Sequence, residues 1–182
     1  MTARKLALAA FAAVAVSFTA AHARPRPASL GGFAFEANKT FGLGVEVISP
    51  VGLNGKWFFN ANQALDFGIG DDFVIGNRAG FHVYGDLLFH PFSLANVPAF
   101  ELPFYVGIGA RIWTFRDSAI AAPNDATAFG VRVPLGVSFD FNNLPLDVFA
   151  QFVPTLDFFS GHPVHSVFVD IDFSIGVRFW FN

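Results

Sequence analysis

The last stretch of the chain reads SVFVDIDFSIGVRFWF, from Ser166 to Phe181. Its alternate residues fall into two sets, because successive side chains of a β-strand point to opposite faces. The interleaved set is mostly polar and includes Asp170, Asp172 and Arg178. A helix would mix these charges into its apolar stripe, so the stretch is predicted to be one long strand. The other set is wholly apolar: Val167, Val169, Ile171, Phe173, Ile175, Val177, Phe179 and Phe181.

The same alternation recurs through the chain. Hydrophobic residues make up 53% of it, with 17 Gly and 11 Pro. Beyond the first 23 residues, however, there is no apolar run of about 18 residues of the kind that forms a spanning helix. Dispersed apolar residues with many turn formers favour short strands and turns. Eight strands are predicted, at 41–48, 52–59, 65–70, 81–90, 104–113, 129–140, 146–153 and 166–181.

Several boundaries are harder to assign. Pro134 lies inside the sixth strand, cannot donate a ladder hydrogen bond, and is expected to cause a bulge or an edge. The first strand could begin at Phe33, but Lys39 would then lie on its apolar face. Segments 91–101 and 157–165 are expected to be connections.

The first residues have the features of an export signal. Arg4 and Lys5 precede an apolar stretch, and Ala21 and Ala23 flank His22 in the small-x-small pattern of a cleavage site. The predicted division is a signal peptide at 1–23, a periplasmic lead-in at 24–32 and a β-barrel at 33–182. Cleavage would lower the net charge from −3 to −5. No basic stripe is present, so a nucleic-acid partner is not expected.

The end of the chain resembles the C-terminal assembly signal of bacterial outer-membrane β-barrels. The matching residues are Ser174, Gly176, Phe179 and Phe181, although Asn182 follows where the family often ends on the aromatic. The mature chain as a whole resembles the small OmpA- and OmpX-like proteins, and 42–57 also resembles an uncharacterised family of small outer-membrane proteins. The resemblance implies an all-β, eight-stranded antiparallel up-and-down transmembrane β-barrel located in the outer membrane. It also implies lipid, the barrel-assembly machinery and periplasmic chaperones as partners.

The second face of the strands decides between membrane and water. It is rich in Gly and in charges of both signs, which suits the narrow interior of an eight-stranded barrel. A water-facing surface would carry more Lys and Glu, yet Lys39 and Lys56 are the only lysines after residue 23. The apolar face is therefore predicted to meet lipid. Val169 is expected near the middle of the membrane, with Asp170 pointing inward.

The inward charges are candidates for function. They form either a plug of salt bridges or the lining of an ion path, and the plug is favoured because eight strands leave little bore. The predicted set is Glu46, Lys56, Asp66, Asp86, Arg111, Arg132, Asp147, Asp170, Asp172 and Arg178.

Other chemistry is poorly supported by the sequence. His82, Tyr84 and Asp86 share one strand face, but residues two apart on a strand lie roughly 6.6 Å apart, so each is expected to pair across strands rather than with the others. His162 and His165 near Asp157 do not complete a metal-ligand set. The chain has no Cys, and no His-x-Ser motif of lipid-deacylating barrels. No catalytic residue, metal or cofactor is therefore predicted.

The sequence thus favours a monomeric outer-membrane barrel with a structural or interaction role in the cell envelope. Three alternatives stay open: a narrow pore, a lipid-modifying enzyme of the outer membrane, and a soluble lipocalin-like ligand-binding barrel.

The cleavage site gives a direct prediction. Protein recovered from outer membranes should have the intact mass of a chain that begins at Arg24, because the signal peptidase recognises Ala21 and Ala23. Recovery of Met1 in that fraction would contradict it.

Overall fold

The structure, a computed structural model, describes residues 34–72, 80–116, 125–160 and 167–181. The predicted signal peptide, its cleavage site and the lead-in 24–32 lie outside these residues. The regular elements in the described ranges are strands, which confirms the all-β prediction. No helix among the described residues is long and apolar enough to cross a membrane.

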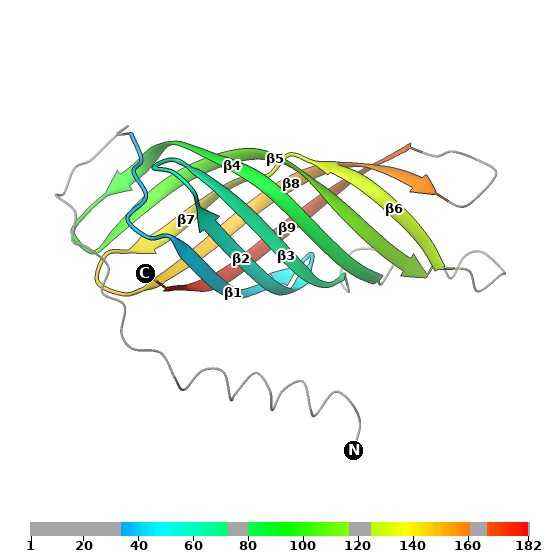
Figure 1. Ribbon diagram of the computed structural model, residues 1–182, viewed down its shortest axis with the longest axis horizontal. Coiled ribbons are helices and arrows are strands. Elements are labelled where there is room, and N and C mark those ends of the chain that lie inside the picture. Colours follow the sequence, from blue (N-terminus) through cyan, green and yellow to red (C-terminus); the bar gives the residue numbers. More distant parts are fainter. Residues whose placement is uncertain (1–33, 73–79, 117–124, 161–166, 182) are drawn as a thin grey trace, which may run out of the picture.

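Antiparallel strands form one closed ring (Figure 1). β9 pairs with β8 on one side and with β1 on the other, which closes it. β6 and β7 both lie between β5 and β8, so they share one position and the ring has eight. The strands are β1 (Phe41–Ile48), β2 (Val51–Phe58), β3 (Gln63–Asp72), β4 (Gly80–Asn96), β5 (Phe100–Arg116), β6 (Asp125–Arg132), β7 (Leu135–Phe141), β8 (Leu146–Ser160) and β9 (Val167–Phe181).

β6 and β7 are two halves of one strand, interrupted at Pro134. The register with β5 is the same on both sides of the interruption, since Gly109 pairs with Arg132 and Val106 pairs with Leu135. Proline has no N–H to donate, but the Pro134 carbonyl accepts a hydrogen bond from a β5 amide at 2.9 Å. The bulge or edge expected at Pro134 was therefore wrong. One donor is lost and the strand continues in register.

The ring is strongly sheared. Following paired residues once around the ring from Arg178 leads through Gly44, Asn54, Gly68, Tyr84, Arg111, Gly130 and Asp157 to Phe168. The path therefore returns to β9 ten residues away from its start. With about 4.8 Å between strands and about 3.3 Å per residue, this shear tilts eight strands by about 41°. The diagonal course of the strands in Figure 1 reflects this tilt.

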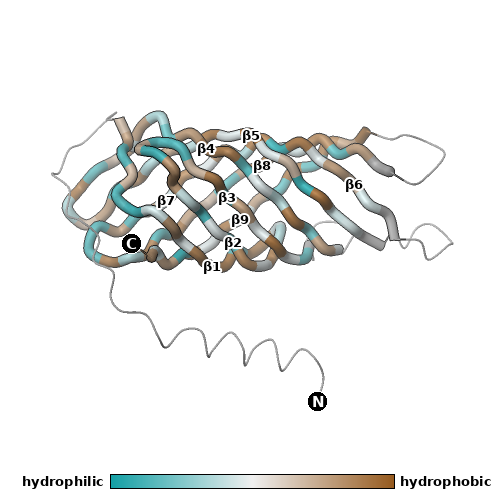
Figure 2. Tube along the Cα trace, viewed as in Figure 1, coloured by the Kyte–Doolittle hydropathy of each residue, from teal (hydrophilic) through white to brown (hydrophobic). Residues whose placement is uncertain are grey.

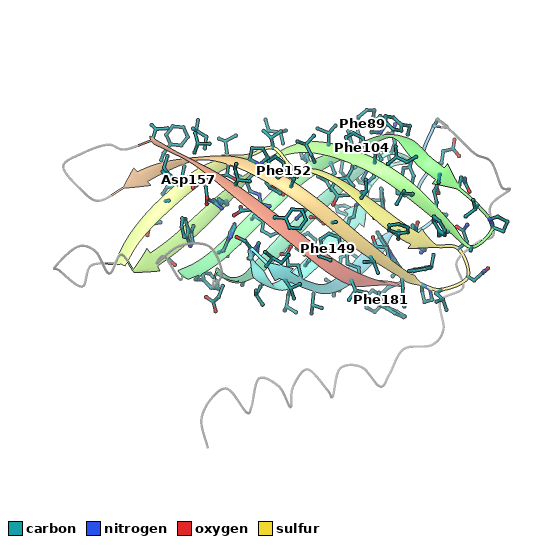
Figure 3. All side chains as sticks on the ribbon, turned by 180° about the vertical axis from the view of Figure 1, so that it is seen from behind. Phe89, Phe104, Phe149, Phe152, Asp157 and Phe181 are labelled. Atoms are coloured by element: carbon teal, nitrogen blue, oxygen red, sulfur yellow. The ribbon has the colours of Figure 1, made fainter. Side chains whose placement is uncertain are left out.

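The two faces differ as the alternation predicted. Apolar and polar residues alternate along the strands in Figure 2. Val169 is 66% exposed, whereas Asp172 is 2% exposed. On β8, Phe152 lies on the outer surface and Phe149 is buried inside (Figure 3). The ring therefore has an apolar outside and a polar, filled inside.

The ring has two unlike ends. At the terminal end, where β1 begins and β9 finishes, the connections are short: 59–62, 97–99 and 142–145. At the loop end they are 49–50, 73–79, 117–124 and 161–166.

Two expectations about the strand bounds were wrong. Segment 91–101 is mostly strand, because β4 continues to Asn96 through register shifts and β5 starts at Phe100. β8 continues to Ser160, so Asp157 lies in a strand rather than in a loop.

Closure between β1 and β9 depends on a glycine. A Cβ at Gly44 would lie 1.9 Å from the Val177 carbonyl oxygen and 2.7 Å from the Arg178 Cα. We expect Gly44→Ala to lower the free energy of unfolding by about 1–3 kcal/mol, the usual cost of overpacking. The measurement is urea unfolding of the refolded protein in detergent.

The matched control is Gly85→Ala, because a Cβ at Gly85 meets nothing within 4 Å. Equal stability of the two variants would contradict this account of ring closure.

Candidate functional site

The interior of the ring contains the ten charged residues assigned to it from the sequence. Buried ions require partners, and here the partners come from strands far apart around the ring. Asp170 is half-buried, and the other nine are buried: Glu46, Lys56, Asp66, Asp86, Arg111, Arg132, Asp147, Asp172 and Arg178.

Arg111, on β5, organises the loop end of the interior. Its Nε donates to Asp157 Oδ1 at 3.0 Å, and its Nη2 contacts the other oxygen of that carboxylate, so the pair is bidentate. Nη1 lies 2.6 Å from Asp172 Oδ2 and Nη2 lies 2.7 Å from Asp170 Oδ2. The Ser49 hydroxyl donates to Asp172 Oδ1 at 3.0 Å. One arginine thus joins β5 to β8, β9 and the turn after β1.

Arg132, on β6, occupies the next level. Its Nη1 lies 3.1 Å from His82 Nε2, its Nε lies 3.3 Å from Asp86 Oδ1, and its guanidinium lies 3.9 Å from the Tyr84 ring centroid. Arginine has no acceptor atom, so His82 Nε2 accepts the hydrogen bond. The Tyr84 hydroxyl donates to Glu46 Oε1 at 2.7 Å, across the ring on β1. The three β4 residues therefore make their hydrogen bonds and ion pairs across strands, as their spacing predicted, and the His82 and Tyr84 rings also meet edge to face with centroids 5.7 Å apart.

Arg178, on β9, crosses the interior closer to the terminal end than Arg132 does. Its Nε and Nη2 donate to Asp147 at 3.0 and 2.8 Å. Its Nη1 donates to Asp66 at 2.9 Å and to the Asn54 side-chain oxygen at 3.1 Å. The Asn54 amide donates to the Tyr84 hydroxyl at 2.8 Å, which links this level to the one above.

Aromatic rings fill the terminal end. Lys56 Nζ lies 2.8 Å from His90 Nε2 and 4.5 Å from the Tyr105 ring centroid. Phe58 stacks on Trp180 with centroids 5.7 Å apart. All five side chains are 9% exposed or less, so aromatic rings packed around Lys56 fill this end.

Sequence reasoning missed four buried charged residues. Glu101 was placed in the connection 91–101, but it lies in β5, is 2% exposed and accepts a hydrogen bond from the Ser93 hydroxyl. Asp157 was placed in a connection, although its signal was present: the alternation of β8 continues through exposed Phe152, Leu156 and Phe158. Asp140 lies in the predicted strand 129–140 but was not included in the predicted charge set. Lys39 precedes β1 and contacts Asp140, and no local pattern predicts this contact.

The arrangement braces strands that are not neighbours in the ring. Arg111, Arg132 and Arg178 are each held by carboxylates, and Arg132 also contacts the His82 imidazole. Within the described ranges, no group of three His, Asp or Glu side chains could hold a metal ion. His162 and His165 lie outside these ranges.

Comparison of the chain with family models, curated proteins and solved structures finds no match.

The Arg178 cluster gives a stability prediction. Arg178→Met would leave Asp66 and Asp147 buried without their cation, and breaking such a pair costs about 3–5 kcal/mol. We expect the free energy of unfolding, measured by urea titration, to fall by that amount.

The control is Asp170→Asn at the edge of the network. The Asp170 side chain is 25% exposed, and Arg111 keeps two other carboxylates, so this change should cost less than about 1 kcal/mol. A neutral Arg178→Met would contradict the bracing role.

Proposed function

We propose that this chain is an integral outer-membrane protein, and that its ring is a β-barrel spanning the membrane around a closed, charge-braced interior. Its role is structural, or it serves as a small interaction module of the cell envelope. The observation that carries the proposal is the reversed polarity of the ring, with apolar side chains outside and ion pairs inside. A soluble ligand-binding barrel has the opposite arrangement.

The outer surface supports contact with lipid. Large exposed apolar side chains occur around the ring, among them Leu43 on β1, Ile69 on β3, Leu87 on β4, Ile108 on β5 and Phe152 on β8. Soluble monomers rarely expose contiguous apolar patches larger than a few hundred Å². Lipid would cover this surface, and the closed ring pairs the backbone groups that an open sheet edge would leave unsatisfied.

The height of the apolar surface fits a bilayer. A residue on a strand tilted by about 41° rises about 2.5 Å along the ring axis. The outward apolar set of β9 runs from Val167 to Phe181, a height of about 35 Å, compared with about 25–30 Å of hydrocarbon. The β1–β2 hairpin is shorter, and the loop-end parts of β8 and β9 extend beyond it (Figure 1).

The interior supports a closed barrel rather than a pore. Arg111, Arg132 and Arg178 each contact a strand at least two positions away around the ring. Their side chains therefore cross the space that an ion path would need. No observation favours an enzymatic role.

The last strand supports recognition by the assembly machinery. Phe181 pairs with Phe41 where β9 closes on β1, and their ring centroids lie 6.1 Å apart. Phe179 lies 5.2 Å from Phe181, centroid to centroid. A strand that can pair by its edge and presents spaced aromatic side chains suits recognition by β-strand addition.

The lipid contact is tested by a charge at the middle of the outer surface. Val169 was expected there, but it lies close to the loop-end tip of β9, beyond the last residue of β1. Ile175 pairs with both Val47 and Ala150 and lies nearer the middle. We expect Ile175→Arg to cost about 2–4 kcal/mol in lipid vesicles and Val169→Arg to cost less.

Ile175→Leu is the control and should be neutral. A neutral Ile175→Arg would contradict the membrane assignment, as would recovery of the wild-type protein in the soluble fraction without detergent.

A closed interior predicts no conductance. Folded protein in a planar bilayer should give no stable single-channel steps, because arginine side chains cross the interior. Steps from a monomer that disappear on substitution of Arg111 or Arg132 would replace the closed barrel with a pore.

A further inference from the structure

Residues 34–40 cross the terminal end of the ring without forming a strand. Phe35 is 4% exposed, and its ring centroid lies 5.6 Å from Phe58 and 5.0 Å from His90. Both partners are inward residues of β2 and β4. Phe35 therefore inserts into the aromatic group that fills this end of the interior.

Lys39 holds the other end of the segment. It is 3% exposed, and its ammonium contacts the Asp140 carboxylate at the end of β7. It also donates to the Phe141 carbonyl at 3.0 Å and to the Leu144 and Leu146 carbonyls at 3.3 Å. These acceptors all come from the β7–β8 turn region. Lys39 thus fastens the segment to the opposite side of the ring end.

The segment lies outside the strand ladder of the ring. Backbone hydrogen bonds link it to the ring from the Ala37 amide to the Ala61 carbonyl at 2.6 Å and from the Phe58 amide to the Thr40 carbonyl at 2.8 Å. The side chains of Glu36 and Thr40 are exposed. A segment outside the strand ladder opens at a lower free energy than paired strands do.

A buried amine lies beneath the segment. Lys56 is 1% exposed, its Nζ has His90 Nε2 as its hydrogen-bond partner, and it also lies 5.1 Å from the Phe58 ring centroid. Among the described residues, no carboxylate lies within ion-pairing distance of it. Phe35 packs on both the imidazole and the phenyl ring that surround this amine, so Phe35 separates it from the ring end.

We propose that residues 34–40 are a releasable plug of the terminal end. Phe35 fills the opening, and Lys39 fastens the segment to the β7–β8 turn. Release exposes the Lys56–His90 pair to solvent and opens the part of the interior next to the terminal end, while the strand ring stays closed. The plug depends on side-chain packing at one end of the ring and not on lipid. Because the preceding lead-in 24–32 is predicted to be periplasmic, the proposed plug would face the periplasm in a membrane-spanning ring.

The chain contains its own reporter, because Lys56 is the amine beneath the plug. Full-length folded protein in detergent is treated with formaldehyde and cyanoborohydride, and methylation of Lys56 is followed over time by peptide mass mapping. We expect Phe35→Ala and Lys39→Met to raise the rate of Lys56 methylation by about tenfold or more, since each removes one anchor of a locally stable segment. Thr40→Ala, at an exposed side chain of the same segment, should match wild type.

Folding of every variant is checked by the gel shift between unheated and heated samples. Unchanged Lys56 methylation in folded Phe35→Ala and Lys39→Met overturns the plug, even if the wild-type protein inserts into membranes. If the two variants raise Lys56 methylation but the wild-type protein does not insert into membranes, the proposed function is contradicted and the plug is supported.

Hydrogen exchange on the wild-type protein tests release without any substitution. The Ala37 amide should exchange at least about tenfold faster than amides of the β1–β9 ladder, because the segment opens locally while the ring does not. If the Ala37 amide were as protected as the amides of that ladder, the segment would not open locally and the proposal would be overturned.

Discussion

Pairing of β9 with β1 is the constraint on which the rest of the structure depends. The pairing closes the sheet, and closure with a shear of ten residues sets the tilt and therefore the width of the interior. Every second side chain must then fit inside. Glycine occupies several inward positions where a Cβ would collide with a neighbour: the one at Gly136 would lie 2.4 Å from the Tyr105 ring, and the one at Gly176 would lie 2.4 Å from Phe149. Large and small residues thus fill the same narrow space together.

The polar interior follows from the apolar exterior. Because the outward positions carry the apolar residues, the inward positions hold the charges, and each buried charge needs a partner. Arginine suits this task, since its planar group binds a carboxylate with two donors while its face packs on a ring. Arg178 does both, pairing with Asp147 and lying 4.0 Å from the Phe149 ring centroid. The network therefore ties together strands that are not neighbours.

The two ends of the interior are closed by different means. In the part of the chain that the structure describes, Arg111 and three aspartates fill the loop end, whereas aromatic rings, Lys39, Lys56 and the segment 34–40 fill the terminal end. Aromatic packing and the Lys39–Asp140 pair are easier to open than the arginine network, because fewer buried groups lose partners. This difference is the physical basis for a movable terminal end on a fixed ring.

The sequence by itself determined the all-β class, the eight strand positions and the direction of the side chains. These follow from a period of two, which is a local property of each strand. Tertiary structure alone decided which carboxylate meets which arginine, since Arg111 and Asp172 are brought together by register and shear across three strand positions. It also decided that Pro134 keeps the register and that Lys39 reaches Asp140. Each of these depends on partners distant in sequence, and local alternation carries no information about them.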